Sequence, residues 1–246
     1  MNQLTTAASG RWAIIRLALL PFFLFGLILL LAGCGGDQSG GGDTNLDAPT
    51  VLSQAISTTN ATTSFHFKID VKGQTAAGSA FYIKGGEGDY AKPNQVSAKV
   101  DAVYAGATVQ ASYAGKGDQQ YIAVIGCWQP FQGLTLAPDK AATDIMNNIA
   151  SLSKSGVENI DGVQNHHLTG KINAQQLAAL SPEAVQTNTV NVDMWVGVAD
   201  KQLHRVLLSG AISRGDAAKA SYDIHFSDFN KPVTVNLPPA SDICKK

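Results

Sequence analysis

Apolar and polar residues alternate along most of the chain beyond residue 60. Between Phe65 and Val71 every second residue is apolar, and the residues between them are polar. Successive side chains of a β-strand point to opposite faces, so this period of two predicts a strand with one face on a core and one face in water. The same spacing, in whole or in part, predicts further strands at residues 81–83, 96–102, 109–113, 120–125, 190–198, 203–212 and 218–226.

Other segments have the spacing of a helix. Asp47 and Pro49 form a favourable N-cap and first-turn pair, and apolar residues then recur at helical spacing until about residues 58–61. A second, short helix is predicted to begin at Asn173, with Leu177 on its inner side. These two segments predict helices at the start and towards the middle of the folded region.

The longest predicted helix lies between them. Pro138 begins it, and it is expected to end near Gly156. Its apolar stripe consists of Ile145, Met146, Ile149 and Leu152. Residues 157–172 are then predicted to form two short strands around an Asp161-Gly162 turn. Many antiparallel strands with a few helices predict an α+β fold, in which a strongly curved antiparallel sheet wraps over the helices.

The N-terminus has the three parts of a lipoprotein signal. Arg11 and Arg16 supply positive charge, residues 17–31 are apolar, and Ala32-Gly33 lead into Cys34. We expect cleavage before Cys34, which then carries fatty acyl chains such as palmitate. The lipidated protein is expected at the extracytoplasmic face of the cell membrane.

This interpretation divides the chain into three parts. Residues 1–33 are the expected signal peptide, residues 34–45 a flexible Gly-rich tether, and residues 46–246 a single domain. The alternative is an ordinary transmembrane anchor, because the apolar run extends back towards Trp12.

Composition and motifs argue against several functions. The net charge is −1 and only 15% of residues are charged, so nothing favours binding to nucleic acid. The sequence has no Gly-x-Ser-x-Gly, His-Glu-x-x-His or Cys-x-x-Cys motif, and we expect no catalytic residue, metal or cofactor. Most of the five histidines are expected on solvent faces of strands. His166 and His167 are neighbours in one strand, so they point to opposite faces and cannot bind one metal ion together.

With Cys34 assigned to the anchor, two cysteines remain. Cys127 and Cys244 are an even pair in an oxidising compartment, which suggests a disulfide. The alternative is two separate thiols, since the sequence does not show whether their Cα atoms come close enough.

Several stretches together resemble the LppX/LprA/LprF/LprG lipoproteins. Besides the segment ending at Cys34, they are Ser64-Phe65-His66-Phe67, Gly126-Cys127-Trp128, Ile160-Asp161-Gly162-Val163, Leu168-Thr169-Gly170, Val192-Asp193-Met194-Trp195-Val196, residues 226–233 and Pro238-Pro239. The resemblance covers nearly all of residues 46–240. It implies a half-barrel similar to the lipoprotein carrier LolA, with a large apolar cavity between sheet and helices.

The resemblance also implies a function. The expected activity is to bind acyl lipids or glycolipids in the cavity and carry them within or across the cell envelope, without covalent chemistry. The expected partners are these lipids, the membrane through Cys34, and a membrane lipid exporter, and the protein is expected to be a monomer. The alternatives are a non-transporting surface lipoprotein that acts as a scaffold or sensor, and an enzyme such as an esterase.

The candidate cavity walls are the residues expected to point inward. Aromatic and aliphatic residues of this kind are equally typical of a packed core, and a shift of one residue in register would turn every side chain of a strand to the other face. The candidates are Phe65, Phe67, Ile69, Phe81, Ile83, Val192, Met194, Leu207 and Ile224 on strands, with Ile145, Ile149 and Leu152 from the middle helix.

Overall fold

The structure is a computed structural model, and it describes residues 42–74, 81–131, 136–181, 184–185 and 187–245. All described residues belong to one unit, which spans residues 39–246. The predictions for residues 1–41, including the lipidation of Cys34, lie outside the described residues.

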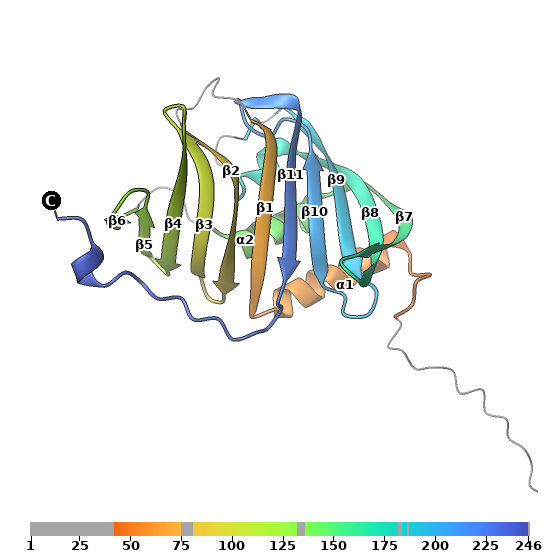
Figure 1. Cartoon of the computed structure of the whole chain (residues 1–246). Helices are drawn as coiled ribbons and strands as arrows, with labels where there is room; N and C mark the ends of the chain where they lie inside the picture. Colours follow the sequence, from red (N-terminus) through yellow and green to blue (C-terminus); the bar gives the residue numbers. More distant parts are fainter. Residues whose placement is uncertain (1–41, 75–80, 132–135, 182–183, 186, 246) are drawn as a thin grey trace, which may run out of the picture. The chain divides into compact units, whose positions relative to one another are not determined.

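The strands in the described ranges form one antiparallel sheet of 11 strands (Figure 1). Their spatial order is β6-β5-β4-β3-β2-β1-β11-β10-β9-β8-β7. The sheet is curved and does not close on itself, as the predicted fold class requires. The strands are β1 (Ser64–Gln74), β2 (Phe81–Ala91), β3 (Gln95–Tyr104), β4 (Ala107–Lys116), β5 (Gln119–Ala123), β6 (Gln129–Pro130), β7 (Ala150–Ile160), β8 (Val163–Asn173), β9 (Thr189–Gly197), β10 (Leu203–Ser209) and β11 (Asp216–Ser227).

The spatial order of the strands shows two antiparallel meanders that join in the middle of the sheet. β1 to β6 follow one another outward in one direction, and β7 to β11 run back inward from the other edge. The two halves meet where the first strand pairs with the last, with Phe67 opposite Phe226 and Ile69 opposite Ile224. This central pair brings residues far apart in the chain onto one wall.

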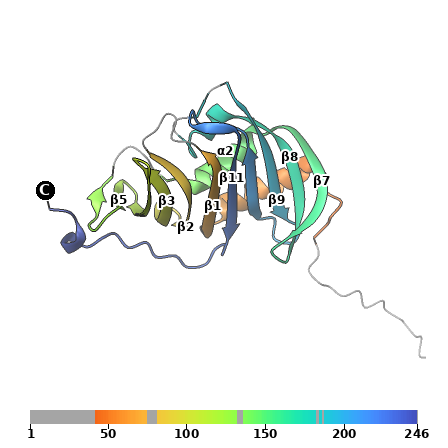
Figure 2. The ribbon, with the colours of Figure 1, turned by 45° about the horizontal axis from the view of Figure 1, so that its top comes forward.

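The helices lie on one face of the sheet (Figure 2). They are α1 (Ala48–Ala61) and α2 (Pro138–Asn148), which pack against each other, and α2 also contacts the one-turn 3-10 helix η1 (Ala174–Leu177). The Asp47 carboxylate accepts a hydrogen bond of 2.9 Å from the Thr50 N–H, so the predicted N-cap of α1 is confirmed. α2 lies against the middle of the sheet, where it faces β1 to β3 and β11 across the pocket and β9 and β10 in the core.

The predicted end of the middle helix was wrong. α2 ends at Asn148, Ile149 has extended backbone angles, and β7 follows immediately. Leu152 therefore lies on a strand that pairs with β8. Serines alternate with other residues at 151, 153 and 155, a period of two that fits a strand. Pairing with β8 satisfies the backbone of this segment, so both strands of the hairpin are 11 residues long rather than short.

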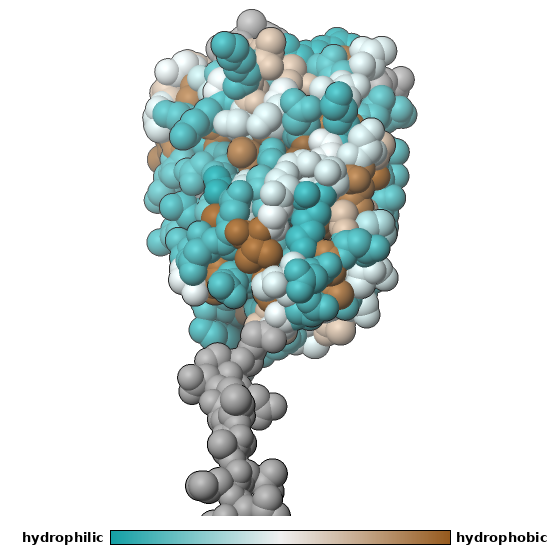
Figure 3. Space-filling view, turned by 90° about the vertical axis from the view of Figure 1, so that its right-hand side faces the viewer, coloured by the Kyte–Doolittle hydropathy of each residue, from teal (hydrophilic) through white to brown (hydrophobic). Residues whose placement is uncertain are grey.

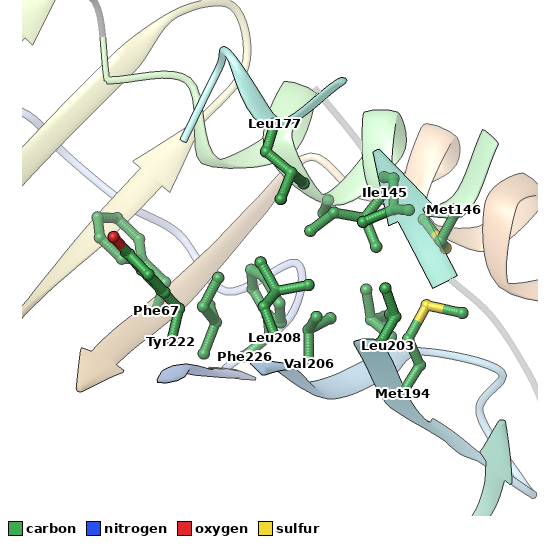
Figure 4. Packing of buried hydrophobic residues seen from close by; sticks show 14 of the residues in the cluster. Phe67, Ile145, Met146, Leu177, Met194, Leu203, Val206, Leu208, Tyr222 and Phe226 are labelled. Atoms are coloured by element: carbon green, nitrogen blue, oxygen red, sulfur yellow. The ribbon is translucent and has the colours of Figure 1, made fainter. Parts of the chain in front are cut away.

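The core lies between the inner face of the sheet and the helices (Figure 4). Side chains from the strands, such as Met194, Val206 and Leu208, point towards Ile145 and Met146 of α2. All five are at most 1% exposed. The face of the molecule turned to the viewer in Figure 3 is mainly hydrophilic, with small separate hydrophobic areas. Within the described ranges, none of the helices is long and apolar enough to cross a membrane.

The C-terminal segment crosses the ends of several strands. After β11 it passes the ends of β1 to β4 and reaches the β5–β6 edge, where it includes the short 3-10 helix η2 (Ala240–Asp242) (Figure 1). There the Cys127 and Cys244 sulfur atoms form a disulfide, with 5.1 Å between the Cα atoms. The Trp128 backbone forms hydrogen bonds of 2.8 Å with Asp242 and with Cys244. The disulfide therefore joins the C-terminus to an edge of the sheet.

His166 does not lie on a solvent face, where most of the histidines were expected. It lies on the inner face of β8 and is fully buried. Neither ring nitrogen has a hydrogen-bond partner among the residues described. Burial lowers the pKa of His166 below its ordinary value, and the positive charges of Lys154 and Lys201 lower it further, while Asp43 opposes the shift. The imidazole is therefore held in its neutral form.

We expect His166 to make the fold sensitive to acid. As pH falls below about 6.5, the unfolded chain binds a proton at His166 before the folded chain does, so the folded state loses stability. Replacing His166 by leucine removes this loss and changes stability at about pH 8 by less than about 1 kcal/mol, because no hydrogen bond is broken. Thermal unfolding of both proteins between about pH 5 and 8 measures the difference. An equal fall in Tm for both proteins would contradict the expectation.

Candidate functional site

A pocket of about 340 Å³ lies between the inner face of the sheet and α2. Its walls come from β1, β2, β3 and β11 on one side and from α2 on the other. Most of the side chains that line it are apolar, among them Phe67, Ile69, Val100, Ile145 and Ile224. This volume falls in the range of small-molecule binding sites, about 300–1,000 Å³.

The residues around the pocket explain why space remains there. Gly85 and Gly86 add no side chain to the wall on β2, and Ala98 is the neighbouring small residue on β3. Ala141 and Ala142 face the pocket from α2. Because protein interiors are otherwise packed to high density, a space persists where small residues face one another. Small residues on β2, β3 and α2 thus leave room beside the β1–β11 pair that joins the two halves of the sheet.

The structure brings five of the predicted wall residues together at this pocket. They are Phe67 and Ile69 on β1, Ile83 on β2, Ile145 on α2 and Ile224 on β11. They come from four elements, and the β1–β11 pairing places three of them side by side.

The other predicted wall residues lie elsewhere. Phe65 is buried against Tyr90 and Phe226, and Val192 and Met194 belong to the packed core. Ile149 and Leu152 are partly buried and pack against that core. The side chain of Phe81 is outside the described part of the structure.

The expected inward position of Leu207 was wrong. Its neighbours Val206 and Leu208 are fully buried on the inner face of β10, so Leu207 lies on the outer face. There it is paired with Asp193 on one side and Asp223 on the other. On β10 the alternation is interrupted, because three successive residues, 206–208, are apolar. Such a run does not show which of its residues point to the inner face.

One end of the pocket is polar, and the sequence pattern did not predict it. Asp216, at the start of β11, accepts three hydrogen bonds at Oδ2, from the Ile212 N–H, the Ser213 N–H and the Tyr222 hydroxyl, at 2.8–2.9 Å. The Gln74 amide donates to the Tyr222 oxygen at 2.7 Å. Burial raises the pKa of Tyr222 above its ordinary value, and the hydrogen bond to Asp216 adds to this effect, so the hydroxyl stays protonated.

Histidines other than His166 lie beside carboxylates. The nitrogen–oxygen distances are 2.8–3.2 Å for His66 with Asp89, His167 with Glu158 and Asp193, His204 with Asp200, and His225 with Asp223. In the part of the chain that the structure describes, no three His, Cys, Asp or Glu side chains are grouped so that they could bind a metal ion.

Comparison with known proteins decides the family. The profile of the LppX_LprAFG lipoproteins matches residues 47–235, which include every strand of the sheet and the whole pocket. The chain belongs to the LppX_LprAFG lipoprotein family. Lipoarabinomannan carrier protein LprG of Mycobacteroides abscessus is 26% identical over 238 residues, which cover 91% of this chain and 97% of that protein. Lipoprotein LprA of Mycobacterium tuberculosis is 23% identical, with 87% and 94% covered.

Solved structures of LppX_LprAFG proteins share the fold. The crystal structure of LprF from Mycobacterium bovis has a TM-score of 0.62 at 15% identity, and covers 80% of this chain and 99% of LprF. Mycobacterium tuberculosis LppX has a TM-score of 0.57 at 20% identity, with 76% and 99% covered. At these identities the likeness establishes the fold, a curved, unclosed sheet over helices.

Proposed function

We propose that this LppX_LprAFG protein binds acylated lipids or glycolipids in the pocket under α2 and carries them within or across the cell envelope. The observation that carries the proposal is the apolar pocket between β1, β2, β3, β11 and α2. An acyl chain gains about 0.8 kcal/mol for each methylene group that leaves water, so an apolar wall needs few polar contacts to hold it.

The relatives support a carrier rather than an enzyme. LprG of Mycobacteroides abscessus is named as a carrier of lipoarabinomannan, a glycolipid. The pocket wall around Ile69, Val100 and Ile145 is apolar and buries an acyl chain without reacting with it. In our proposal the protein therefore moves its ligand unchanged, as a monomer, and receives it from or delivers it to a membrane or a membrane lipid exporter.

Lipids that copurify with the full-length protein test this function. They are extracted with organic solvent, which leaves covalently attached acyl chains on the protein, and identified by mass spectrometry. We expect acylated lipids in an amount comparable to the protein. A protein that contains no extractable lipid and takes up none from vesicles would act as a scaffold or sensor instead.

We further propose that Cys34 carries the lipid anchor that holds this domain at the extracytoplasmic face of the membrane. Metabolic labelling with a radioactive fatty acid should mark the wild-type protein and not the Cys34→Ala variant, because no other cysteine follows an apolar signal segment. Labelling that persists in Cys34→Ala would show that the anchor is elsewhere.

A further inference from the structure

The polar end of the pocket contains two buried acceptor oxygens that have no donor among the residues that the structure describes. Asp216 and Gln74 are opposite each other in the β1–β11 pairing, and both line the pocket. Asp216 Oδ1 and Gln74 Oε1 are buried from solvent, and neither has a hydrogen-bond partner among the described residues. Buried acceptors are rarely left unpaired, because they lose their hydrogen bonds to water without replacement.

The surrounding hydrogen bonds hold these two oxygens in place. The three donors to Asp216 Oδ2 fix the carboxylate and leave its other oxygen unused. One N–H of the Gln74 amide donates to the Tyr222 oxygen, and the amide oxygen accepts no hydrogen bond from a described residue. Asp216 therefore offers only an acceptor to the pocket, whereas Gln74 offers its amide oxygen and the second hydrogen of its NH2 group.

The apolar wall continues directly from this polar end. Tyr222 connects the two parts, since its hydroxyl belongs to the polar network and its side chain is buried and lines the pocket. Phe67, Ile224 and Phe226 then line the pocket beyond it. The pocket therefore has a polar end followed by an apolar wall, and an amphipathic molecule with one polar end fits this arrangement.

We propose that Asp216 and Gln74 select lipids with hydroxyl donors next to the acyl chain, and disfavour lipids that end in a free carboxylate. This rests on the proposed lipid-binding function and adds the class of head group. Hydroxyl groups of a glycerol or sugar supply the donors that Asp216 Oδ1 and Gln74 Oε1 need. A fatty acid carboxylate supplies none, and its negative charge is repelled by Asp216.

Three lipids with the same chain separate the head group from the apolar contacts. Binding of radiolabelled monopalmitoylglycerol, methyl palmitate and palmitate to the full-length, delipidated protein is measured by equilibrium gel filtration. Monopalmitoylglycerol should bind at least about tenfold more tightly than methyl palmitate, the usual effect of a hydrogen bond to a charged group. Palmitate should bind the most weakly of the three.

Asp216→Asn is the informative variant. The amide oxygen replaces Oδ2 and accepts the same three hydrogen bonds, while the amide nitrogen replaces Oδ1 and turns an acceptor into a donor. The preference for monopalmitoylglycerol over methyl palmitate should fall below about threefold, and palmitate should bind more tightly than to wild type. Gln74→Met, at the half-exposed end of β1, removes the second acceptor and should also reduce the preference. It serves as the test if Asp216→Asn does not fold.

Asp223→Asn is the matched control, because Asp223 lies on the same strand but is bonded to Arg205 on the outer face. It should leave the order of the three lipids unchanged. Equal binding of monopalmitoylglycerol and methyl palmitate to wild type, or an unchanged preference in both pocket variants, would overturn the proposed selection while lipid binding stands. Failure of all three lipids to bind wild type would instead overturn the proposed function together with the selection.

Discussion

Replacing Val100 by tryptophan is expected to weaken lipid binding at least about tenfold and to leave the protein folded. Val100 lines the pocket and is only partly buried, so an indole at this position has space to extend into the pocket. There it occupies the volume that an acyl chain needs. Because it fills space rather than displacing packed atoms, we expect the free energy of unfolding to change by less than about 1 kcal/mol.

Val206→Trp is the matched control. Val206 is also a valine on the inner face of the sheet, but it is fully buried in the packed core and does not line the pocket. Overpacking there should destabilise by about 1–3 kcal/mol or more. Thermal unfolding and binding of a fluorescent acyl lipid are measured on both variants. If Val100→Trp unfolds as early as Val206→Trp, or binds lipid like wild type, the pocket is not the lipid site.

Removing the Cys127–Cys244 disulfide should have the largest effect on stability. The bond joins residues 117 apart in the chain, and closing so long a loop restricts the unfolded state strongly. We expect the variant with serine at both positions to lose about 2–5 kcal/mol. In a domain of this size that corresponds to a Tm lower by roughly 5–15 °C.

Reduction provides the internal control for this variant. A reducing agent should lower the Tm of the wild-type protein towards that of the double serine variant, and should not change the Tm of the variant itself. Alkylation of the denatured, unreduced protein followed by peptide mass spectrometry shows whether Cys127 and Cys244 are linked. Alkylation of both thiols in unreduced protein would rule out the bond and its stabilisation.

The apolar part of the candidate site was only partly predictable from the sequence. Alternation placed Phe67, Ile69 and Ile83 on inward faces, because the period of a strand is local information. It did not separate pocket residues from core residues such as Phe65 and Met194, since both need apolar side chains. What distinguishes them is the small residues opposite them, and these are known only when the elements are packed together.

The polar end of the pocket was not predicted, for a different reason. Gln74 and Asp216 are ordinary polar residues at the ends of strands, and no motif marks them. They form a candidate site only because β1 pairs with β11 and places them opposite each other, and one buried oxygen of each has no donor among the described residues. The burial of His166 was not predicted for the same reason, because it depends on which residues pack over β8.

The sequence by itself determined the local features of this protein. The alternating strands, the Asp47 N-cap and the turn at Asp161-Gly162 follow from preferences of a few neighbouring residues. Only the tertiary structure decided the joining of the two meanders through β1 and β11, the end of α2 at Asn148 and the outward face of Leu207. These depend on pairing between segments distant in the chain, and the free energy of that pairing comes from the packed whole rather than from either segment alone.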